Sequence, residues 1–332
     1  MHVTSPLSNA CKGKIFLIIL FSCCSLPCSA WGFYGHQRIN YYAVFLLPPE
    51  MMLLYKPHIN FLTEHAVDPD KRRYAVEEEG PRHYIDLDRY GAYPFDSLPR
   101  NWDDAVEKFS ADTLQKHGIV PWWIMVMQRR LTAAFRDKDK NRILKISAEL
   151  GHYISDAHVP LHTSSNHNGQ YTNQRGIHGF WESRIPELLA ETEWDFFLGK
   201  ARYIENKEAF IWQRVLESAA ASDSVLQLER KLNEQFPQDR KFAFEERNGK
   251  VIRQYSTAYT KAYDKLLNGM VERRMQLSIY SIACFWMSAW IDAGQPALSQ
   301  AELAFSEQEL VEFEKLNLAW KQRTMIGRKE ED

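Results

Sequence analysis

The chain has 332 residues, of which 45% are hydrophobic and 25% are charged, and its formal net charge is −2. This is the composition of a globular protein, and it excludes disordered, collagen-like and polytopic membrane proteins. The near-neutral charge lacks the basic excess expected of a general binder of nucleic acids or anionic membranes. With only 15 Gly and 14 Pro, the chain is also poor in the residues typical of loop-rich barrels.

The amino-terminal segment has the pattern of a secretory signal peptide. Lys12 and Lys14 precede the apolar run 15–21, and small residues close the segment at Ala30. The apolar run is too short to span a bilayer comfortably. We therefore expect cleavage after Ala30, export to the periplasm or the exterior, and Trp31 as the new amino terminus.

An alternative is lipoprotein processing at Cys23, because Leu20-Phe21-Ser22-Cys23 loosely resembles a lipoprotein box. Lipid would then be attached at Cys23, and Trp31 would lie inside the chain without a free amine. Cleavage after Ala30 instead removes four of the five cysteines and leaves Cys284 alone. A mature chain with one thiol has no internal disulfide, so its core or another device must stabilise it.

Apolar residues recur at three- and four-residue spacing through most of the chain, which predicts helices. The predicted helical segments are 36–47, 50–65, 102–116, 121–136, 141–157, 180–192, 205–235 and 256–293. No stretch shows sustained strand alternation, which disfavours doubly wound and barrel folds. We expect the charged stretch 238–250 to be a surface excursion between two helices. The apolar stretch 276–291 contains several serines, and we expect a buried core helix there rather than a membrane span.

The sequence therefore predicts an all-α protein with a single compact domain of many helices. Residues 1–30 are the expected signal peptide, residues 31–320 the domain, and residues 321–332 a charged tail that frays. No internal repeat is present, and nothing in the sequence implies a stable protein partner, so we expect a monomer.

A cluster of histidines in the middle of the chain contains the same pattern twice. His152 and Asp156 are four residues apart, so both project from one face of a predicted helix. His178 and Glu182 repeat this spacing at the start of another helix, and His162 follows a proline that ends the first one. Because polar groups on apolar faces must be paired or ligated, the two pairs predict more than one metal ion. The other two histidines of the cluster, His158 and His167, are expected outside the ligand set.

The expected new amino terminus offers further ligands. Trp31 would carry a free α-amine five residues before His36. An α-amine has a pKa of about 8, so that zinc readily displaces its proton. The amine nitrogen and the carbonyl oxygen of the same residue form a five-membered chelate. Gly32 and Gly35 would let the chain fold closely around a metal ion.

These residues form an ordered combination that resembles a known superfamily. The combination consists of Trp31-x-x-x-x-His36, Asp68, His83-Tyr84-Ile85-Asp86, His152-x-x-x-Asp156-x-x-x-x-x-His162 and His178-x-x-x-Glu182. It resembles the zinc-dependent phospholipases C and the single-strand-specific zinc nucleases. The resemblance spans residues 31–182 and implies a single-domain helical fold with three zinc ions in a cleft.

Position by position, the resemblance implies three ligand sets, which are Asp68, His83 and His152; the amine and carbonyl of Trp31 with His36; and His162, His178 and Glu182. Asp156 would bridge the first two ions. Asp70 stays an alternative to Asp68, which is preferred because its fifteen-residue gap to His83 resembles the family's spacing. Asp86, three residues beyond His83, is expected to orient water or to support a ligand.

The sequence also departs from its relatives. The last ligand is Glu182, as in the phospholipases, whereas the nucleases usually have Asp there. The secreted nucleases carry disulfides, which this chain lacks. Both departures weaken the inference that this chain shares the substrate specificity of the nucleases.

Three zinc ions bring six positive charges, and the three carboxylates of the implied ligand sets return three. The surplus of about three charges would attract a phosphate ester. Zinc lowers the pKa of bound water to about 7, which supplies hydroxide to attack phosphorus in line while the metals neutralise its oxygens. The sequence therefore predicts an exported zinc-dependent phosphodiesterase, a hydrolase of phospholipase C or nuclease type.

The substrate is expected to be a phospholipid or single-stranded nucleic acid. Lys71, Arg72 and Arg73, with Tyr84 and Tyr90, could bind nucleic acid, although a solvated charge run is the commoner meaning. The alternative function is a non-catalytic, zinc-stabilised helical interaction protein, in which the metals would be closed and four-coordinate.

Overall fold

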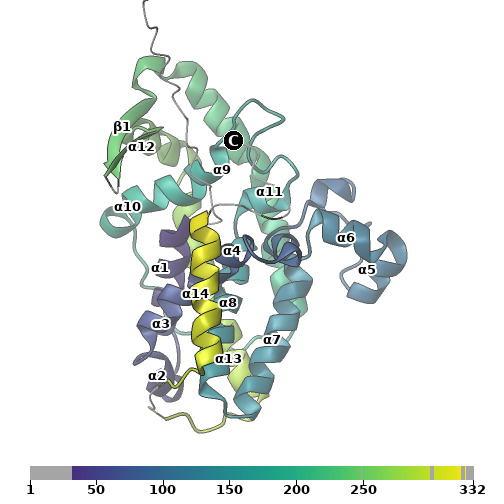
Figure 1. Cartoon of the computed structure of the whole chain (residues 1–332). Coiled ribbons are helices and arrows are strands. Elements are labelled where there is room, and N and C mark those ends of the chain that lie inside the picture. Colours follow the sequence, from purple (N-terminus) through teal and green to yellow (C-terminus); the bar gives the residue numbers. More distant parts are fainter. Residues whose placement is uncertain (1–31, 248, 300–302, 323–325, 327–332) are drawn as a thin grey trace, which may run out of the picture.

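The structure is a computed structural model, and it describes residues 32–247, 249–299, 303–322 and 326. It is mostly helical, which confirms the predicted all-α class apart from one small sheet (Figure 1). The α-helices are α1 (Gly32–Val44), α2 (Pro49–Tyr55), α3 (Ile59–Glu64), α4 (Asp68–Arg72), α5 (Trp102–Phe109), α6 (Ala111–His117), α7 (Val120–Arg136), α8 (Lys140–Asp156), α9 (Ile177–Gly179), α10 (Ile185–Glu193), α11 (Lys207–Gln235), α12 (Thr257–Leu267), α13 (Met270–Asp292) and α14 (Glu307–Gln322).

Short helical turns join these elements. They are η1 (His65–Val67), η2 (Glu77–His83), η3 (Leu87–Arg89), η4 (Pro160–Thr163), the π-helical η5 (Phe180–Arg184) and η6 (Gln238–Arg240). The sheet has two strands, β1 (Phe242–Arg247) and β2 (Lys250–Tyr255). The predicted signal peptide and Trp31 lie outside the described residues.

Helix α8 is the central element of the bundle. It packs against α1, α7 and α13, and Figure 1 shows α14 running in front of this group. Asp139 caps its first turn by accepting a hydrogen bond from the Arg142 backbone N–H at 3.1 Å. From Ser147 to Asp156 every residue of α8 is buried. Because this half has no solvent-facing side, its polar side chains must find partners inside the protein.

A close approach between α1 and α8 fixes how these two helices sit. A Cβ atom on Gly151 would lie 2.0 Å from the Asn40 Oδ1 atom, so only glycine fits there. Asn40 in turn donates hydrogen bonds to the carbonyl oxygens of Leu62 and Ala148. The glycine thus brings α1 and the ligand-bearing turn of α8 into direct contact.

The charged stretch 238–250 is not only a surface excursion, because it contains β1 and the start of β2. The two strands pair antiparallel, from Phe242 opposite Tyr255 to Arg247 opposite Lys250. A search for helical periodicity could not reveal strands of six residues in which apolar and charged side chains do not alternate regularly. The hairpin is anchored to η5: the Tyr255 ring stacks on Phe180 with centroids 3.8 Å apart, and Arg184 donates to the Tyr255 carbonyl oxygen.

The apolar stretch 276–291 lies within α13 and in the core, as predicted. Ser278, Ser281 and Ser288 are each at most 1% exposed. Among the described residues, no helix is long and apolar enough to cross a membrane. Cys284 is buried in the same helix as a free thiol.

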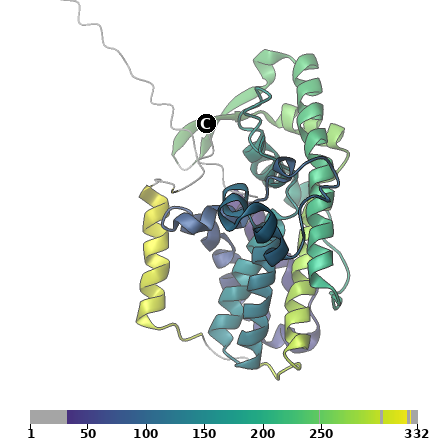
Figure 2. The ribbon, with the colours of Figure 1, turned by 90° about the vertical axis from the view of Figure 1, so that its right-hand side faces the viewer.

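Helix α14 lies along the side of the bundle (Figure 2). It contacts α4, and the Trp320 ring packs against Phe33 with centroids 5.0 Å apart. Beyond the helix, the backbone N–H of Ile326 donates to the Arg73 carbonyl oxygen at 3.1 Å. The predicted tail begins at 321, inside this helix, and residues 323–325 and 327–332 of it lie outside the described residues.

His158, which follows α8, is bound inside the core on both ring nitrogens. Its Nδ1 atom donates to the Ile154 carbonyl oxygen at 2.7 Å, so Nε2 must accept from the Ser281 hydroxyl at 3.1 Å. Burial lowers the pKa of His158 from its ordinary value to about 3. The folded protein therefore holds this imidazole neutral. Because both ring nitrogens already bind protein groups, His158 belongs to none of the groups that could hold a metal ion.

This burial predicts a pH dependence of stability. The unfolded chain binds a proton at His158 below pH of about 6.5, and the folded chain does not, so stability is lost as pH falls from there toward 3. We expect His158→Gln to be less stable than the wild type at pH 7, with a deficit that shrinks by up to roughly 1.4 kcal/mol per pH unit on acidification. Urea unfolding of both zinc-free proteins between pH 7 and pH 5 measures this. If the free energies of unfolding of the wild type and His158→Gln change equally with pH, His158 does not have the lowered pKa.

Candidate metal centre

Eight side chains with metal-binding atoms converge in the core from seven different elements. They are His36 of α1, Asp70 of α4, His83 of η2, His152 and Asp156 of α8, His162 of η4, His178 of α9 and Glu182 of η5. None of them is more than 4% exposed. They form three groups, and within each group the ligand atoms lie within 4.8 Å of one another.

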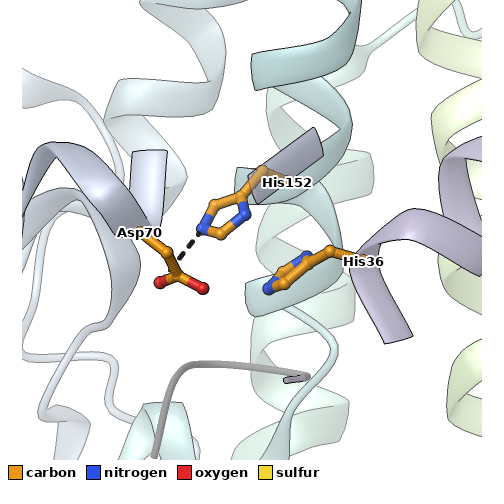
Figure 3. A group of neighbouring side chains, drawn as sticks. All are labelled: His36, Asp70 and His152. Carbon is orange, nitrogen blue, oxygen red and sulfur yellow. Dashed lines mark ion pairs between the residues drawn. The ribbon is translucent and has the colours of Figure 1, made fainter. Parts of the chain in front are cut away.

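The first group is His36, Asp70 and His152. Figure 3 shows the three side chains pointing toward one another from three separate elements. The His152 Nε2 atom lies 3.7 Å from Asp70 Oδ1. The imidazole rings of His36 and His152 stack with centroids 3.8 Å apart.

The second group is His83, His152 and Asp156, and it shares His152 with the first. Asp156 Oδ2 lies 3.0 Å from His83 Nδ1 and 3.3 Å from His152 Nε2. The other carboxylate oxygen, Oδ1, lies 3.4 Å from His36 Nε2. The two oxygens of Asp156 therefore face different ligands, which is the arrangement that a bridging carboxylate requires.

The third group is His162, His178 and Glu182. The two Nε2 atoms are 2.9 Å apart, and they lie 3.5 Å and 3.0 Å from Glu182 Oε2. The spacing of four residues that the sequence showed places His178 and Glu182 on one side of the α9–η5 turn. This group has the same three members as the predicted third ligand set.

Hydrogen bonds outside the groups orient the imidazoles. His152 Nδ1 donates to the Ala66 carbonyl oxygen at 2.8 Å, and His162 Nδ1 donates to the His83 carbonyl oxygen at 2.7 Å. His36 Nδ1 lies 2.8 Å from the Ser155 hydroxyl, which itself donates to backbone carbonyls of α8. Each contact leaves Nε2 as the atom with a lone pair, and these atoms point inward. Such outer hydrogen bonds are typical of metal-ligating histidines.

Several buried atoms of the groups have no hydrogen-bond partner among the described residues. They are both carboxylate oxygens of Asp70, Oδ1 of Asp156 and Nε2 of His36. A buried polar atom without a partner costs about 1–3 kcal/mol, and more when the group is charged. A cation between these atoms would remove that cost, so the residues fit a metal.

The electrostatics of the groups lead to the same conclusion. Burial, reinforced by the Asp156 charge, raises the pKa of Asp70 well above its ordinary value. Burial and the neighbouring His152 lower the pKa of His36 well below the ordinary value. Burial alone would raise the pKa of Asp156, but His152 and His162 outweigh it and hold that pKa well below its usual range. Neutral imidazole nitrogens mixed with carboxylate oxygens are a donor set suited to zinc.

The structure favours Asp70 over the predicted Asp68. The carboxylate of Asp68 lies 2.5 Å from His65 Nδ1 and 3.1 Å from Lys71 Nζ, and it belongs to none of the three groups. Two residues along a helix turn the side chain by about 200°, so Asp68 and Asp70 project from opposite faces of α4. Asp70, the alternative that the sequence left open, is therefore the better placed of the two to hold a metal ion.

Two other predicted site residues, Trp31 and Asp86, are not among the eight side chains of the groups. Trp31 lies outside the described residues, but Gly32 is close to η5: a Cβ atom there would lie 2.5 Å from the Ser183 hydroxyl. Asp86 is buried, and its Oδ2 atom lies 3.7 Å from His117 Nδ1. It belongs to none of the three groups, so its role as a water-orienting acid stays a prediction.

The basic run 71–73 is paired inside the protein. Lys71 binds Asp68, and Arg72 donates to Glu149 at 2.5 Å and to Glu79 at 3.4 Å. Arg73 is 6% exposed, with its guanidinium 4.0 Å from Asp70. These side chains are therefore paired within the protein rather than forming a solvated charge run, and binding of nucleic acid there stays a prediction.

Sequence reasoning missed Glu79 entirely. It follows two exposed glutamates, so it reads as part of a charged surface, yet its side chain is fully buried beside His83. The available signal was the spacing of four residues between Glu79 and His83, the same as in the two pairs that the sequence did reveal.

No family model matches the chain, and no curated protein matches its sequence.

The contrast between the two aspartates of α4 gives a direct test. We expect Asp70→Asn to weaken zinc binding by more than about tenfold, because it removes a charged ligand, whereas Asp68→Asn should bind zinc like the wild type. Metal analysis after dialysis against a weak chelator measures both. Equal losses in the two variants, or a loss confined to Asp68→Asn, would reverse the assignment.

Proposed function

We propose that the protein is an exported zinc-dependent phosphodiesterase of the kind found in the phospholipase C and zinc nuclease superfamily. The observation that carries the proposal is the convergence of His36, Asp70, His83, His152, Asp156, His162, His178 and Glu182 in three adjoining buried groups. Their order along the chain matches the ligand order that the resemblance implies, with Asp70 in place of Asp68.

Zinc, when bound, supplies Lewis acidity toward water and phosphoryl oxygens. The chain's own residues hold the ligand atoms in place, because outer hydrogen bonds fix the rings of His36, His152 and His162. Asp156 presents one carboxylate oxygen to each of two ligand sets. The groups contain only three carboxylates, so three zinc ions would leave an excess of about three positive charges, which suits a phosphate ester.

The start of α1 supports a ligand role for the processed amino terminus. Gly32 has φ of +43°, a conformation that favours glycine, and it is packed against Ser183, the neighbour of Glu182. Helix α1 therefore begins beside the metal groups. Cleavage after Ala30 would leave the amine of Trp31 one residue before this point, as the terminal chelate requires.

The third group favours catalysis over a purely structural role. Its members are His162, His178 and Glu182, which offer three ligand residues, whereas closed structural zinc sites use four. A position of an ion in this group would thus stay open for water or substrate. The non-catalytic interaction protein stays the competing hypothesis, and hydrolysis distinguishes the two.

The decisive experiment uses the mature chain beginning at Trp31. We expect it to hydrolyse bis(4-nitrophenyl) phosphate, to lose activity with a chelator and to regain it with added zinc. Parallel assays on phosphatidylcholine, single-stranded DNA and RNA then assign the substrate. A folded, zinc-loaded protein that cleaves none of the four would overturn the proposal and support the structural alternative.

Asp156 should be the most sensitive side chain of the site. Loss of an outer contact of a metal ligand costs 10–100-fold, so loss of a carboxylate shared by two ions should cost more than about 100-fold in kcat/KM. We expect Asp156→Asn to exceed the loss in His36→Ala or His178→Ala, with unchanged helicity by circular dichroism. Similar losses in all three variants would argue against a bridging role.

A further inference from the structure

Glu79 is a buried carboxylate that touches a metal-binding histidine from outside the ligand set. Its side chain is fully buried in η2, and its Oε1 atom lies 3.5 Å from His83 Nε2. The opposite ring nitrogen, His83 Nδ1, faces Asp156 and His152 at 3.0 Å. His83 is therefore held between a carboxylate on one side and the metal groups on the other.

This contact differs from those of the other oriented histidines. His152 and His162 each donate to a backbone carbonyl, and His36 contacts a serine hydroxyl. All three partners are neutral. Only for His83, among the histidines of the three groups whose outer partner is described, is that partner an acid.

Three polar side chains clamp the Glu79 carboxylate. Arg82 donates to Oε2 at 2.6 Å, Arg72 approaches the same oxygen at 3.4 Å, and the Tyr153 hydroxyl donates to Oε1. The guanidinium of Arg82 is itself fixed 4.0 Å above the Trp123 ring. Arg72 belongs to α4 and Tyr153 to α8, so the clamp joins the elements that carry Asp70, His83 and His152.

His83 Nε2 is buried without a hydrogen-bond partner among the described residues, and the Glu79 carboxylate faces it at 3.5 Å. We propose that Glu79 is a positioning residue for the metal centre: its carboxylate is placed to accept the Nε2–H of His83 when an ion binds, and thereby to hold Nδ1 toward that ion as a strengthened donor. Carboxylate–histidine–metal arrangements act in this way, because the acid fixes the tautomer and raises the basicity of the ligand. The two arginines compensate the charge of Glu79, so that it can stay ionised in the core. The inference rests on the proposed function only in taking zinc as the ion.

Glu79→Gln tests this role, with Glu149→Gln as the matched control. Both variants remove a carboxylate that binds Arg72, but Glu149 does not contact His83. We expect Glu79→Gln to weaken the zinc ion at His83 by about 10–100-fold and Glu149→Gln to leave it unchanged. Competition with a chromophoric chelator measures the affinity, and the ion at His162, His178 and Glu182 serves as an internal reference.

Unfolding of the zinc-free proteins separates positioning from general stability. If Glu79 contributes the same free energy to folding with and without metal, that contribution cancels from the zinc dissociation constant, as long as the zinc-free protein is folded. If Glu79→Gln does not fold, Glu79→Asp keeps the charge and the arginines but withdraws the carboxylate from His83. That variant should show a smaller loss of zinc affinity in a folded protein.

The outcomes are distinct. Wild-type zinc affinity in a folded Glu79 variant, or an equal loss in Glu149→Gln, overturns the positioning role and leaves the proposed function intact. A wild-type protein that binds zinc but hydrolyses no phosphodiester overturns the proposed function and leaves the role of Glu79 open to the same affinity measurement. A wild-type protein that binds no zinc overturns both.

Discussion

The structure depends on the burial of three carboxylates and five histidines in the core of a helical protein. A charge buried without a partner costs several kcal/mol, so such a cluster persists only when cations or protons occupy it. The hydrogen bonds at His36, His152 and His162 turn their lone pairs inward rather than toward each other's protons. The arrangement thus fits a metal ion, and the surrounding helices hold the eight side chains in adjoining positions.

A spacing of four residues predicted two pairs of side chains in the site. His152 and Asp156 share a face of α8, because four residues make about one α-helical turn. His178 and Glu182 also come together, although the π-helical η5 begins between them. The long helices and the core position of α13 followed from the same pattern. These features are local, so the sequence alone was sufficient.

The parts that the sequence could not predict depend on direction and on tertiary contact. Asp68 and Asp70 are the same residue type two positions apart, so the sequence does not distinguish them. Only the orientation of α4 decides which carboxylate faces the three groups. Glu79 looks like surface because its burial is caused by Arg72, Arg82 and Tyr153, two of which lie on other elements. The hairpin was missed because its stabilising contact, Tyr255 on Phe180, joins segments far apart in the chain.

The sharing of ligands has a consequence for how the centre fills. His152 belongs to two groups, Asp156 faces both, and the carbonyl of His83 fixes the ring of His162 in the third. Because His152 Nδ1 donates to the Ala66 carbonyl oxygen, only its Nε2 atom has a lone pair, and two ions could not both bind this imidazole. In the proposed zinc protein the first two ions would therefore have to divide the shared ligands, with His152 on one ion and Asp156 between the two.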